Sequence, residues 1–189
     1  MERCGWAETG DELLAKYHDE EWGQPTHSDH RHFEFLILEA FQAGLSWMTI
    51  LRKREAFEKA FAGFNPALVA KFDQEKVSEL LNDKGIVRNR LKIEASINNA
   101  KRFLELQKES GSFDKYIWGF VEGKPMVHKR RDMSEIPATT ELSDLISKDL
   151  KKRGFKFVGS TIVYSHLQAV GIVNDHLVDC PRHQASGRS

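Results

Sequence analysis

Two cysteines and two histidines stand in pairs at opposite ends of the chain, where together they could bind a metal ion. Cys4 precedes His18 near the N-terminus, and Cys180 follows His176 by four residues near the C-terminus. Residues four apart share one face of a helix, so the second pair could present both side chains together. Thiolate sulfur and imidazole nitrogen are ligands of structural zinc, and four such ligands leave no coordination position open. The pattern indicates one structural Zn²⁺ per chain.

Buried free thiols are the alternative, because two cysteines and eight histidines in 189 residues will often lie close together by chance. A disulfide is disfavoured, since no apolar signal region precedes the acidic N-terminal stretch. Split ligand pairs also indicate zinc less strongly than a tandem CxxC array. From spacing alone both readings stay open. If zinc binds, residues 1–20 and 174–180 form a clamp between the two ends.

A glutamate lies within an unusually apolar segment, residues 33–47 (FEFLILEAFQAGLSW). At about 100° per residue the apolar side chains leave no clean polar face, which is typical of a buried helix. Glu39 would then lie out of bulk water, and its pKa would rise unless a partner compensates the charge. A salt bridge or a solvated helix end is the alternative. Four aromatic residues of the same early region could stack on a flat cationic ligand or serve as ordinary core residues: Trp6, Tyr17, Trp22 and Trp47.

A short glycine-bounded turn joins two helical patterns over residues 150–161 (LKKRGFKFVGST). Gly154 fits a helix C-cap, and Gly159 lets the next helix, from Ser160, begin close to a neighbouring backbone or phosphate. The free N–H groups at that helix start would form an anion site together with flanking cations such as Lys156. This is the form of a helix-hairpin-helix, a module that grips a DNA backbone without reading its sequence.

Apolar periodicity, with prolines between the periodic segments, predicts helices. Ser28 is an N-cap candidate for the second helix, and Gly44 is its stop. Residues 122–139 read as the one long loop, and no segment alternates convincingly in the manner of a strand. The predicted class is therefore all-α, in a single domain over 1–189, with helices near residues 11–20, 29–43, 47–62, 66–71, 75–82, 87–109, 113–121, 140–152 and 159–171.

At 40% hydrophobic residues, the chain can build one sizeable core. No apolar run is long enough to span a bilayer and no targeting signal is present, which predicts a cytoplasmic protein without a membrane partner. The formal net charge of zero conceals an asymmetry, since residues 1–50 hold ten acidic and three basic residues. The later surplus of positive charge could face phosphates, with solvated helix faces as the alternative. Its clusters are Lys84, Arg88, Arg90 and Lys92; Lys129, Arg130 and Arg131; and Lys148, Lys151, Lys152, Arg153 and Lys156.

Together these residues closely resemble the 3-methyladenine DNA glycosylase I family. The resemblance runs in order from Met1 to about Cys180, through MERCGW, YHDEEWG, LEAFQAGLSW, DKGIVRNRLKI, SEIPATT and KKRGFKFVGSTIVYSHLQAVGIVNDH. It implies a helix-hairpin-helix DNA glycosylase fold whose N- and C-termini are joined by a structural zinc site. It also implies hydrolysis of the N-glycosidic bond of 3-methyladenine in double-stranded DNA, which releases the free base and leaves an abasic site.

The resemblance assigns a role to each matching residue. Glu39 would hydrogen-bond the purine edge with help from Tyr17, and Trp47 would stack on the ring between the walls Trp6 and Trp22. Leu45 would be the apolar wedge that fills the gap left by the flipped nucleotide. The metal ligands would be Cys4, His18, His176 and Cys180, and the hairpin residues on the DNA backbone would be Gly154, Lys156, Gly159 and Ser160.

Asp175 lies near the distance after the hairpin at which other helix-hairpin-helix glycosylases place a catalytic aspartate. It adjoins His176, however, and this family is thought to lack that aspartate, so we expect a structural role. No lysine nucleophile stands out beside the hairpin, so a monofunctional hydrolase is expected, in which selective binding of the leaving group does most of the catalysis. No heptad pattern indicates anything beyond a monomer.

Two other functions remain open from the sequence. A zinc-stabilised DNA-binding module without catalysis would share the clamp and the hairpin, but it gives no reason for Glu39 among aromatics. A metal-dependent phosphohydrolase could use His18 and Asp19 as an HD pair, but it would need an open metal position, and cysteine ligation is typical of a closed site.

Overall fold

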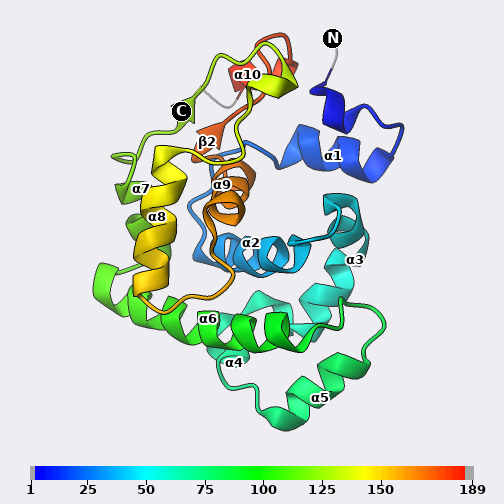
Figure 1. Ribbon diagram of the computed structural model, residues 1–189, viewed down its shortest axis with the longest axis vertical. Helices are drawn as coiled ribbons and strands as arrows, with labels where there is room; N and C mark the ends of the chain where they lie inside the picture. Colours follow the sequence, from blue (N-terminus) through cyan, green and yellow to red (C-terminus); the bar gives the residue numbers. More distant parts are fainter. Residues whose placement is uncertain (1–2, 186–189) are drawn as a thin grey trace.

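The computed structural model describes residues 3–185, and its architecture is almost entirely helical (Figure 1). The all-α prediction is confirmed in the sense of a mostly helical fold. The α-helices of the described part are α1 (Glu12–Glu20), α2 (Asp29–Gln42), α3 (Trp47–Ala60), α4 (Pro66–Val69), α5 (Gln74–Asn82), α6 (Arg90–Ser110), α7 (Phe113–Gly119), α8 (Glu141–Lys152), α9 (Ser160–Ala169) and α10 (Pro181–Ala185). Residues 3–185 also contain three short 3₁₀ turns, η1 (Gly5–Ala7), η2 (Ala62–Phe64) and η3 (Met133–Glu135).

Side-chain caps fix where these helices begin. The Ser28 hydroxyl accepts a hydrogen bond from the first turn of α2, and Gly44, with φ +81°, follows its end, as predicted. The sixth predicted helix was expected from residue 87 and begins later. Asn89 has extended backbone and its side chain accepts from the Lys92 N–H, so the helix starts at Arg90.

Helix α2 lies at the centre of the fold, with α3, α6, α7 and α9 packed around it (Figure 1). Ten consecutive residues, 32–41, are buried, which is the environment that the apolar pattern predicts. Two glutamates are buried with them, Glu34 and Glu39. This helix therefore carries carboxyl groups into the interior, where each needs either a partner or a proton.

The loop predicted over 122–139 contains a short strand and one turn of 3₁₀ helix. Strand β1 (Met126–Val127) pairs in parallel with β2 (Val173–Asn174). The prediction of no sheet was wrong here, because a two-residue strand is too short to show alternation. The pairing ties the loop to the segment that precedes His176.

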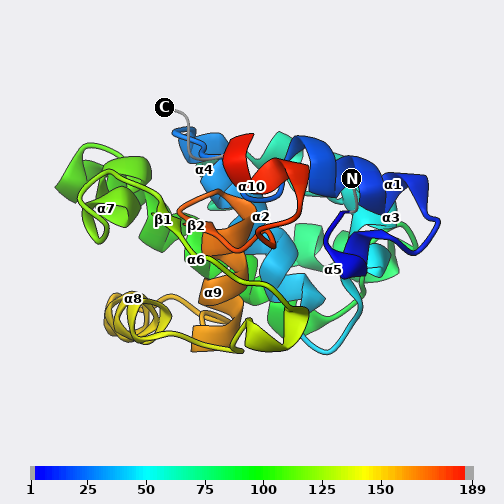
Figure 2. The same ribbon diagram turned by 90° about the horizontal axis from the view of Figure 1, so that it is seen from above.

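The two ends of the described chain lie at the same side of the molecule, with α10 beside the N-terminal segment and α1 (Figure 2). The predicted single domain over 1–189 includes residues 1–2 and 186–189, which lie outside the described residues. Within the part described, no helix is long and apolar enough to cross a membrane.

Candidate functional site

A cavity of about 310 Å³ opens beside α2, and all five residues predicted to form a base pocket line it. The Trp6 and Trp22 rings meet edge to face with centroids 5.0 Å apart, and the Tyr17 ring lies 5.3 Å from that of Trp47. Aromatic walls of this kind accept a flat ring by stacking. The full lining is Trp6, Tyr17, Trp22, Glu39, Gln42, Trp47, Met133, Ile136, Ser165 and Gln168.

Glu39 supplies the acidic group of this cavity. Its side chain is only 4% exposed, and burial raises the pKa of its carboxyl to about 8. Among the residues that the structure describes, none donates a hydrogen bond to it. The carboxyl is therefore largely neutral at pH 7 in the empty cavity. It would ionise readily beside a cation.

Glu34, five residues earlier on the same helix, has the opposite environment. Its carboxylate accepts hydrogen bonds from Arg31 and Arg54, each over 2.7 Å, and both arginines also pair with Glu21. The two guanidinium groups lie over the Phe35 ring, 5.2 and 5.6 Å from its centroid. This ion-pair network therefore packs against Phe35.

Phe35 lies between these arginines and Trp47, which is part of the cavity wall. Its ring stacks on that of Trp47 with centroids 6.3 Å apart and an interplanar angle of 21°. The indole Nε1 of Trp47 is buried and has no hydrogen-bond partner among the described residues. Stacking on Phe35 thus orients the Trp47 ring, and its Nε1–H group is not used in a hydrogen bond to the described residues.

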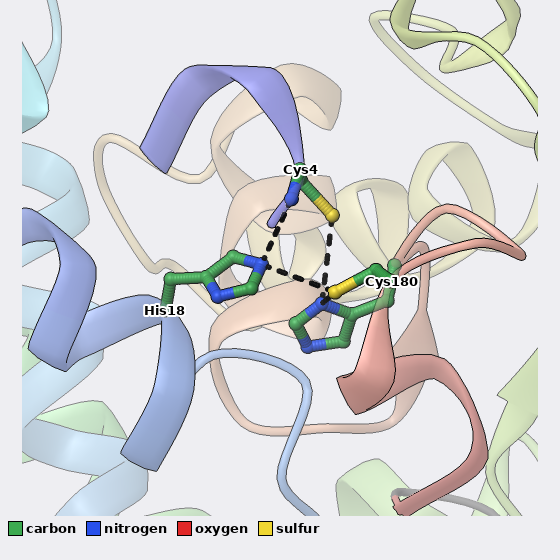
Figure 3. A group of neighbouring side chains, drawn as sticks. Cys4, His18 and Cys180 are labelled. Atoms are coloured by element: carbon green, nitrogen blue, oxygen red, sulfur yellow. Dashed lines mark hydrogen bonds between the residues drawn. The ribbon is translucent and has the colours of Figure 1, made fainter. Parts of the chain in front are cut away.

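The four predicted metal ligands converge at the junction of the two chain ends, as Figure 3 shows for Cys4, His18 and Cys180. All four residues are buried, and their ligand atoms lie within 4.8 Å of one another. The Sγ of Cys180 is 3.6 Å from His18 Nε2, and His176 Nδ1 is 3.6 Å from the sulfur of each cysteine. Zinc bonds of about 2.3 Å to sulfur and about 2.0 Å to nitrogen place tetrahedral ligand atoms about 3.5 Å apart. The spacing therefore fits one tetrahedral metal ion.

The remaining ring nitrogens of both histidines have their own partners. His18 Nδ1 donates to Asp19 over 2.9 Å, and Asp19 in turn accepts from Arg3. His176 Nε2 donates to the carbonyl oxygen of Trp22. Such partners orient metal-binding imidazoles and leave the other nitrogen free as a ligand. This arrangement argues against an HD metal pair, since Asp19 binds the far side of the His18 ring.

The thiols form no disulfide in the described part of the chain. Burial, with a further contribution from the nearby Cys180, raises the pKa of the Cys4 thiol to about 12. Two buried thiols and two buried imidazoles without a cation would be a costly arrangement. A bound Zn²⁺ would remove this cost, because it binds the thiolates directly.

Helices α8 and α9 pack against each other, and the turn between them is fixed to α6. The Asn99 side chain donates to the carbonyl of Lys156 and accepts from its N–H, both over 2.8 Å. Gly154 has φ +85°, the left-handed conformation predicted for a C-cap glycine. Gly159 stands at the start of α9, and a Cβ placed on it would meet nothing within 4 Å. The turn therefore presents open backbone.

The cations around this turn differ in availability. Lys151, Lys152 and Lys156 are exposed, whereas Arg153 is paired with Glu109 and Asp149. The Ser160 hydroxyl is hydrogen-bonded to that of Ser143 at 2.7 Å.

Leu45 lies on the turn between α2 and α3 and is 39% exposed, so it is an apolar side chain at the surface beside Glu39's helix. Lys92 was predicted to belong to a basic surface cluster, and this was wrong. Its side chain is buried, and Nζ donates to the carbonyl oxygens of Phe41 and Ala43 over 2.8 and 2.6 Å. The ammonium group satisfies the C-terminal end of α2 and fixes the turn that carries Leu45.

Comparison with known proteins agrees with this geometry. Residues 6–183 match the family model described as methyladenine glycosylase. DNA-3-methyladenine glycosylase 1 of Escherichia coli (strain K12) is 49% identical over 180 residues, which cover 95% of this chain and 96% of that protein. The chain belongs to the methyladenine glycosylase family.

Solved structures of methyladenine glycosylases have the same fold. A tyrosine-to-phenylalanine variant of 3-methyladenine DNA glycosylase I, crystallised in complex with 3-methyladenine, matches with a TM-score of 0.93 at 39% identity, covering 100% of this chain and 99% of that chain. A glutamate-to-glutamine variant of the Staphylococcus aureus glycosylase matches with a TM-score of 0.92 at 39% identity and the same coverage.

Asp175 has the environment of a structural residue in this methyladenine glycosylase. It is fully buried and does not line the cavity. Its carboxylate accepts hydrogen bonds from His128 Nδ1 over 2.7 Å, from the Tyr164 hydroxyl and from Gln168 Nε2 over 2.7 Å. These donors lower the pKa of Asp175 despite its burial.

Five lining residues of the glycosylase cavity were missed from sequence: Gln42, Met133, Ile136, Ser165 and Gln168. Met133 and Ile136 belong to the segment predicted as a loop, where no periodicity marks them. Ser165 and Gln168 lie on α9, and the only signal for them was a pair of polar residues three apart on an apolar helix.

Proposed function

We propose that this chain hydrolyses the N-glycosidic bond of 3-methyladenine in alkylated double-stranded DNA, releasing the free base and leaving an abasic site. The observation that carries the proposal is the Glu39 carboxyl, buried and unpaired by the described residues, at an aromatic-walled cavity of about 310 Å³. The named relatives are DNA-3-methyladenine glycosylases over almost the whole length of this chain.

The charge of the substrate explains why an unpaired carboxyl is useful. Methylation at N3 makes the purine cationic, so its glycosidic bond is weakened and the base is a good leaving group. With a pKa raised to about 8, Glu39 is largely protonated when the cavity is empty and ionises when a cation binds. Neutral adenine provides no such compensation. Discrimination therefore comes from pairing one charge with another out of water.

The aromatic residues supply the rest of the binding. Trp47 stacks on the purine and Tyr17 completes the polar edge, while Trp6 and Trp22 close the sides, in an arrangement that favours a cationic ring. One solved relative has a tyrosine replaced by phenylalanine, and another has a glutamate replaced by glutamine. The two substituted positions are as far apart in sequence as Tyr17 and Glu39 are in this chain. This correspondence supports the two roles.

DNA binding uses the surface next to the cavity. The target nucleotide must leave the base stack to reach Glu39, and Leu45 fills the gap that it leaves. The α8–α9 turn binds the phosphate backbone as a helix-hairpin-helix, since the exposed N–H groups near Gly159 and the ammonium of Lys156 favour an anion. Gly154 shapes this turn, and Ser160 begins the helix that faces the phosphate.

Zn²⁺ bound by Cys4, His18, His176 and Cys180 has a structural role. Four protein ligands saturate a tetrahedral ion, so it joins the N-terminal segment to the C-terminal one and takes no part in the reaction. The enzyme acts as a monomer that forms a single domain in this proposal.

Catalysis then rests on binding the leaving group. Burial of Glu39 and stacking on Trp47 stabilise the departing base, and water attacks the sugar carbon. Asp175 is saturated with donors and stays structural. The absence of a lysine nucleophile among the described cavity residues fits a monofunctional hydrolase that leaves the DNA strand intact.

The test is to incubate the protein with methylated duplex DNA and to separate the released bases by chromatography. Free 3-methyladenine is expected, with abasic sites in equal amount. A folded, metal-loaded protein that binds the DNA but releases no base would support a binding module without catalysis.

A further inference from the structure

Gln168 is a second polar group of the cavity, and the fold fixes the orientation of its amide. The residue lies on α9 and lines the cavity together with Glu39. Its Nε2 donates to Asp175 Oδ2 over 2.7 Å. No donor of the described residues reaches its Oε1, so this oxygen is the polar atom of Gln168 available to a ligand.

Asp175 determines which end of the amide faces inward. It is fully buried, its Oδ1 accepts a hydrogen bond from His128 Nδ1, and its Oδ2 accepts one from the Tyr164 hydroxyl, with Arg130 Nε 3.6 Å away. With donors on both oxygens, Asp175 acts as an acceptor toward Gln168. Gln168 must therefore turn its nitrogen toward Asp175. A flip of the amide would set two oxygens against each other in a buried site.

We propose that Gln168 is a specificity-determining residue that recognises the substituent at position 6 of the purine through its amide oxygen, which Asp175 keeps facing the cavity. This inference rests on the proposed function of the cavity as a pocket for a flipped base. An amino group at position 6 donates two hydrogen bonds, and a keto oxygen donates none. The pocket then selects 3-methyladenine over 3-methylguanine.

The selection follows from the number of acceptors. The ionised Glu39 carboxylate and the Gln168 oxygen together match the two hydrogens of an adenine amino group. The keto oxygen of guanine would meet two acceptors without a proton between them. Sites that pair a substrate N–H discriminate strongly against an analogue that lacks it, because their own polar atoms are then left unpaired.

The experiment replaces Gln168 by methionine, which keeps the length of the side chain and removes the amide. We expect the ratio of kcat/KM for 3-methyladenine to that for 3-methylguanine, measured on one preparation of methylated DNA, to fall at least about tenfold. The fall comes from slower release of 3-methyladenine. Binding of the two free bases, followed by quenching of tryptophan fluorescence, should show the same loss of preference.

Two further variants separate this role from a structural one. Gln74→Met makes the same chemical change at an exposed position of α5 and should leave the ratio unchanged. Asp175→Asn provides a donor in place of the carboxylate and lets the Gln168 amide flip, so the ratio should fall as in Gln168→Met. If Asp175→Asn does not fold, Gln168→Met decides alone.

An unchanged ratio in folded Gln168→Met, or an equal loss on both bases, would overturn the inference. Failure of the proposed function is distinct, because the unaltered protein would then release no 3-methyladenine. In that case the binding of free 3-methyladenine and free 3-methylguanine still tests the role of Gln168. The unaltered protein should prefer 3-methyladenine, and Gln168→Met should lose this preference.

Discussion

His176 Nε2 donates a hydrogen bond to the carbonyl oxygen of Trp22 over 2.9 Å, and the two rings meet edge to face with centroids 4.6 Å apart. His176 belongs to the cysteine–histidine cluster, whereas Trp22 lines the cavity. A second link is covalent, since His18 of the cluster directly follows Tyr17 of the cavity. The cluster at the chain ends is therefore joined directly to two walls of the pocket, Trp22 and Tyr17.

Replacing a cluster cysteine should remove the metal and loosen these walls. We expect Cys180→Ser to bind substantially less zinc and to melt about 10 °C lower, since a structural metal contributes several kcal/mol to folding. Elemental analysis and thermal denaturation measure the two effects. Asp179→Ser, at the exposed neighbouring position, is the control and should behave as the unaltered protein. A Cys180→Ser protein with full zinc content would exclude Cys180 as a ligand.

The pH dependence of excision should report Glu39. Its ionised form is the one that pairs with the cationic base, and its pKa in the empty cavity is about 8. Because kcat/KM reflects the free enzyme, it should rise about tenfold between pH 6 and pH 7 and level off above pH 8. Steady-state kinetics on methylated DNA across this range provide the test. A flat profile would mean that Glu39 is already ionised before the base binds.

Glu39 should also reduce the stability of the empty protein at neutral pH. Its folded-state pKa of about 8 exceeds the ordinary value of 4.5, so the folded state holds a proton that the unfolded state has lost between these values. Stability from this group is complete below pH 4.5 and is lost as pH rises through 8. Glu39→Gln should therefore raise the free energy of unfolding by about 1–3 kcal/mol at pH 8, and by less at pH 5.

Glu34→Gln on the same helix is the matched comparison for chemical denaturation. Glu34 is paired with Arg31 and Arg54, so its replacement should lower stability at both pH values. Stabilisation of Glu39→Gln that did not grow with pH would contradict the assigned protonation.

A methyl group at Gly159 should obstruct the phosphate backbone without disturbing the fold. The position has ordinary backbone angles, with φ −61° and ψ 156°, and space around its missing Cβ. We expect Gly159→Ala to weaken binding to duplex DNA about tenfold at unchanged melting temperature, measured by fluorescence anisotropy. Gly119→Ala, which also has free space, serves as control. Equal DNA affinity of the two variants would place the backbone contact elsewhere.

The helices and the cavity residues could be predicted because each has a local cause. The Ser28 cap and the glycine after α2 are visible in sequence, and an apolar helix that contains Glu39 predicts a buried carboxyl. The roles of Lys92 and Gln168 could not be predicted. Lys92 depends on the carbonyl groups that end α2, 49 and 51 residues earlier in the sequence. The orientation of the Gln168 amide depends on Asp175, seven residues later, which only the fold brings within hydrogen-bond distance. The pairing of β1 and β2 could not be predicted for a similar reason. A two-residue strand is recognisable only from the hydrogen bonds to its partner strand.

The most direct test of the account compares the protein with its Glu39→Gln variant on the same methylated duplex. Single-turnover release of 3-methyladenine and affinity for the duplex are measured side by side. We predict that the variant loses at least about a hundredfold in release, because the carboxylate that pairs with the cationic base is gone, while affinity for the duplex changes less than twofold. Release at the unaltered rate, or an equal loss of release and of DNA binding, would contradict the central role of Glu39.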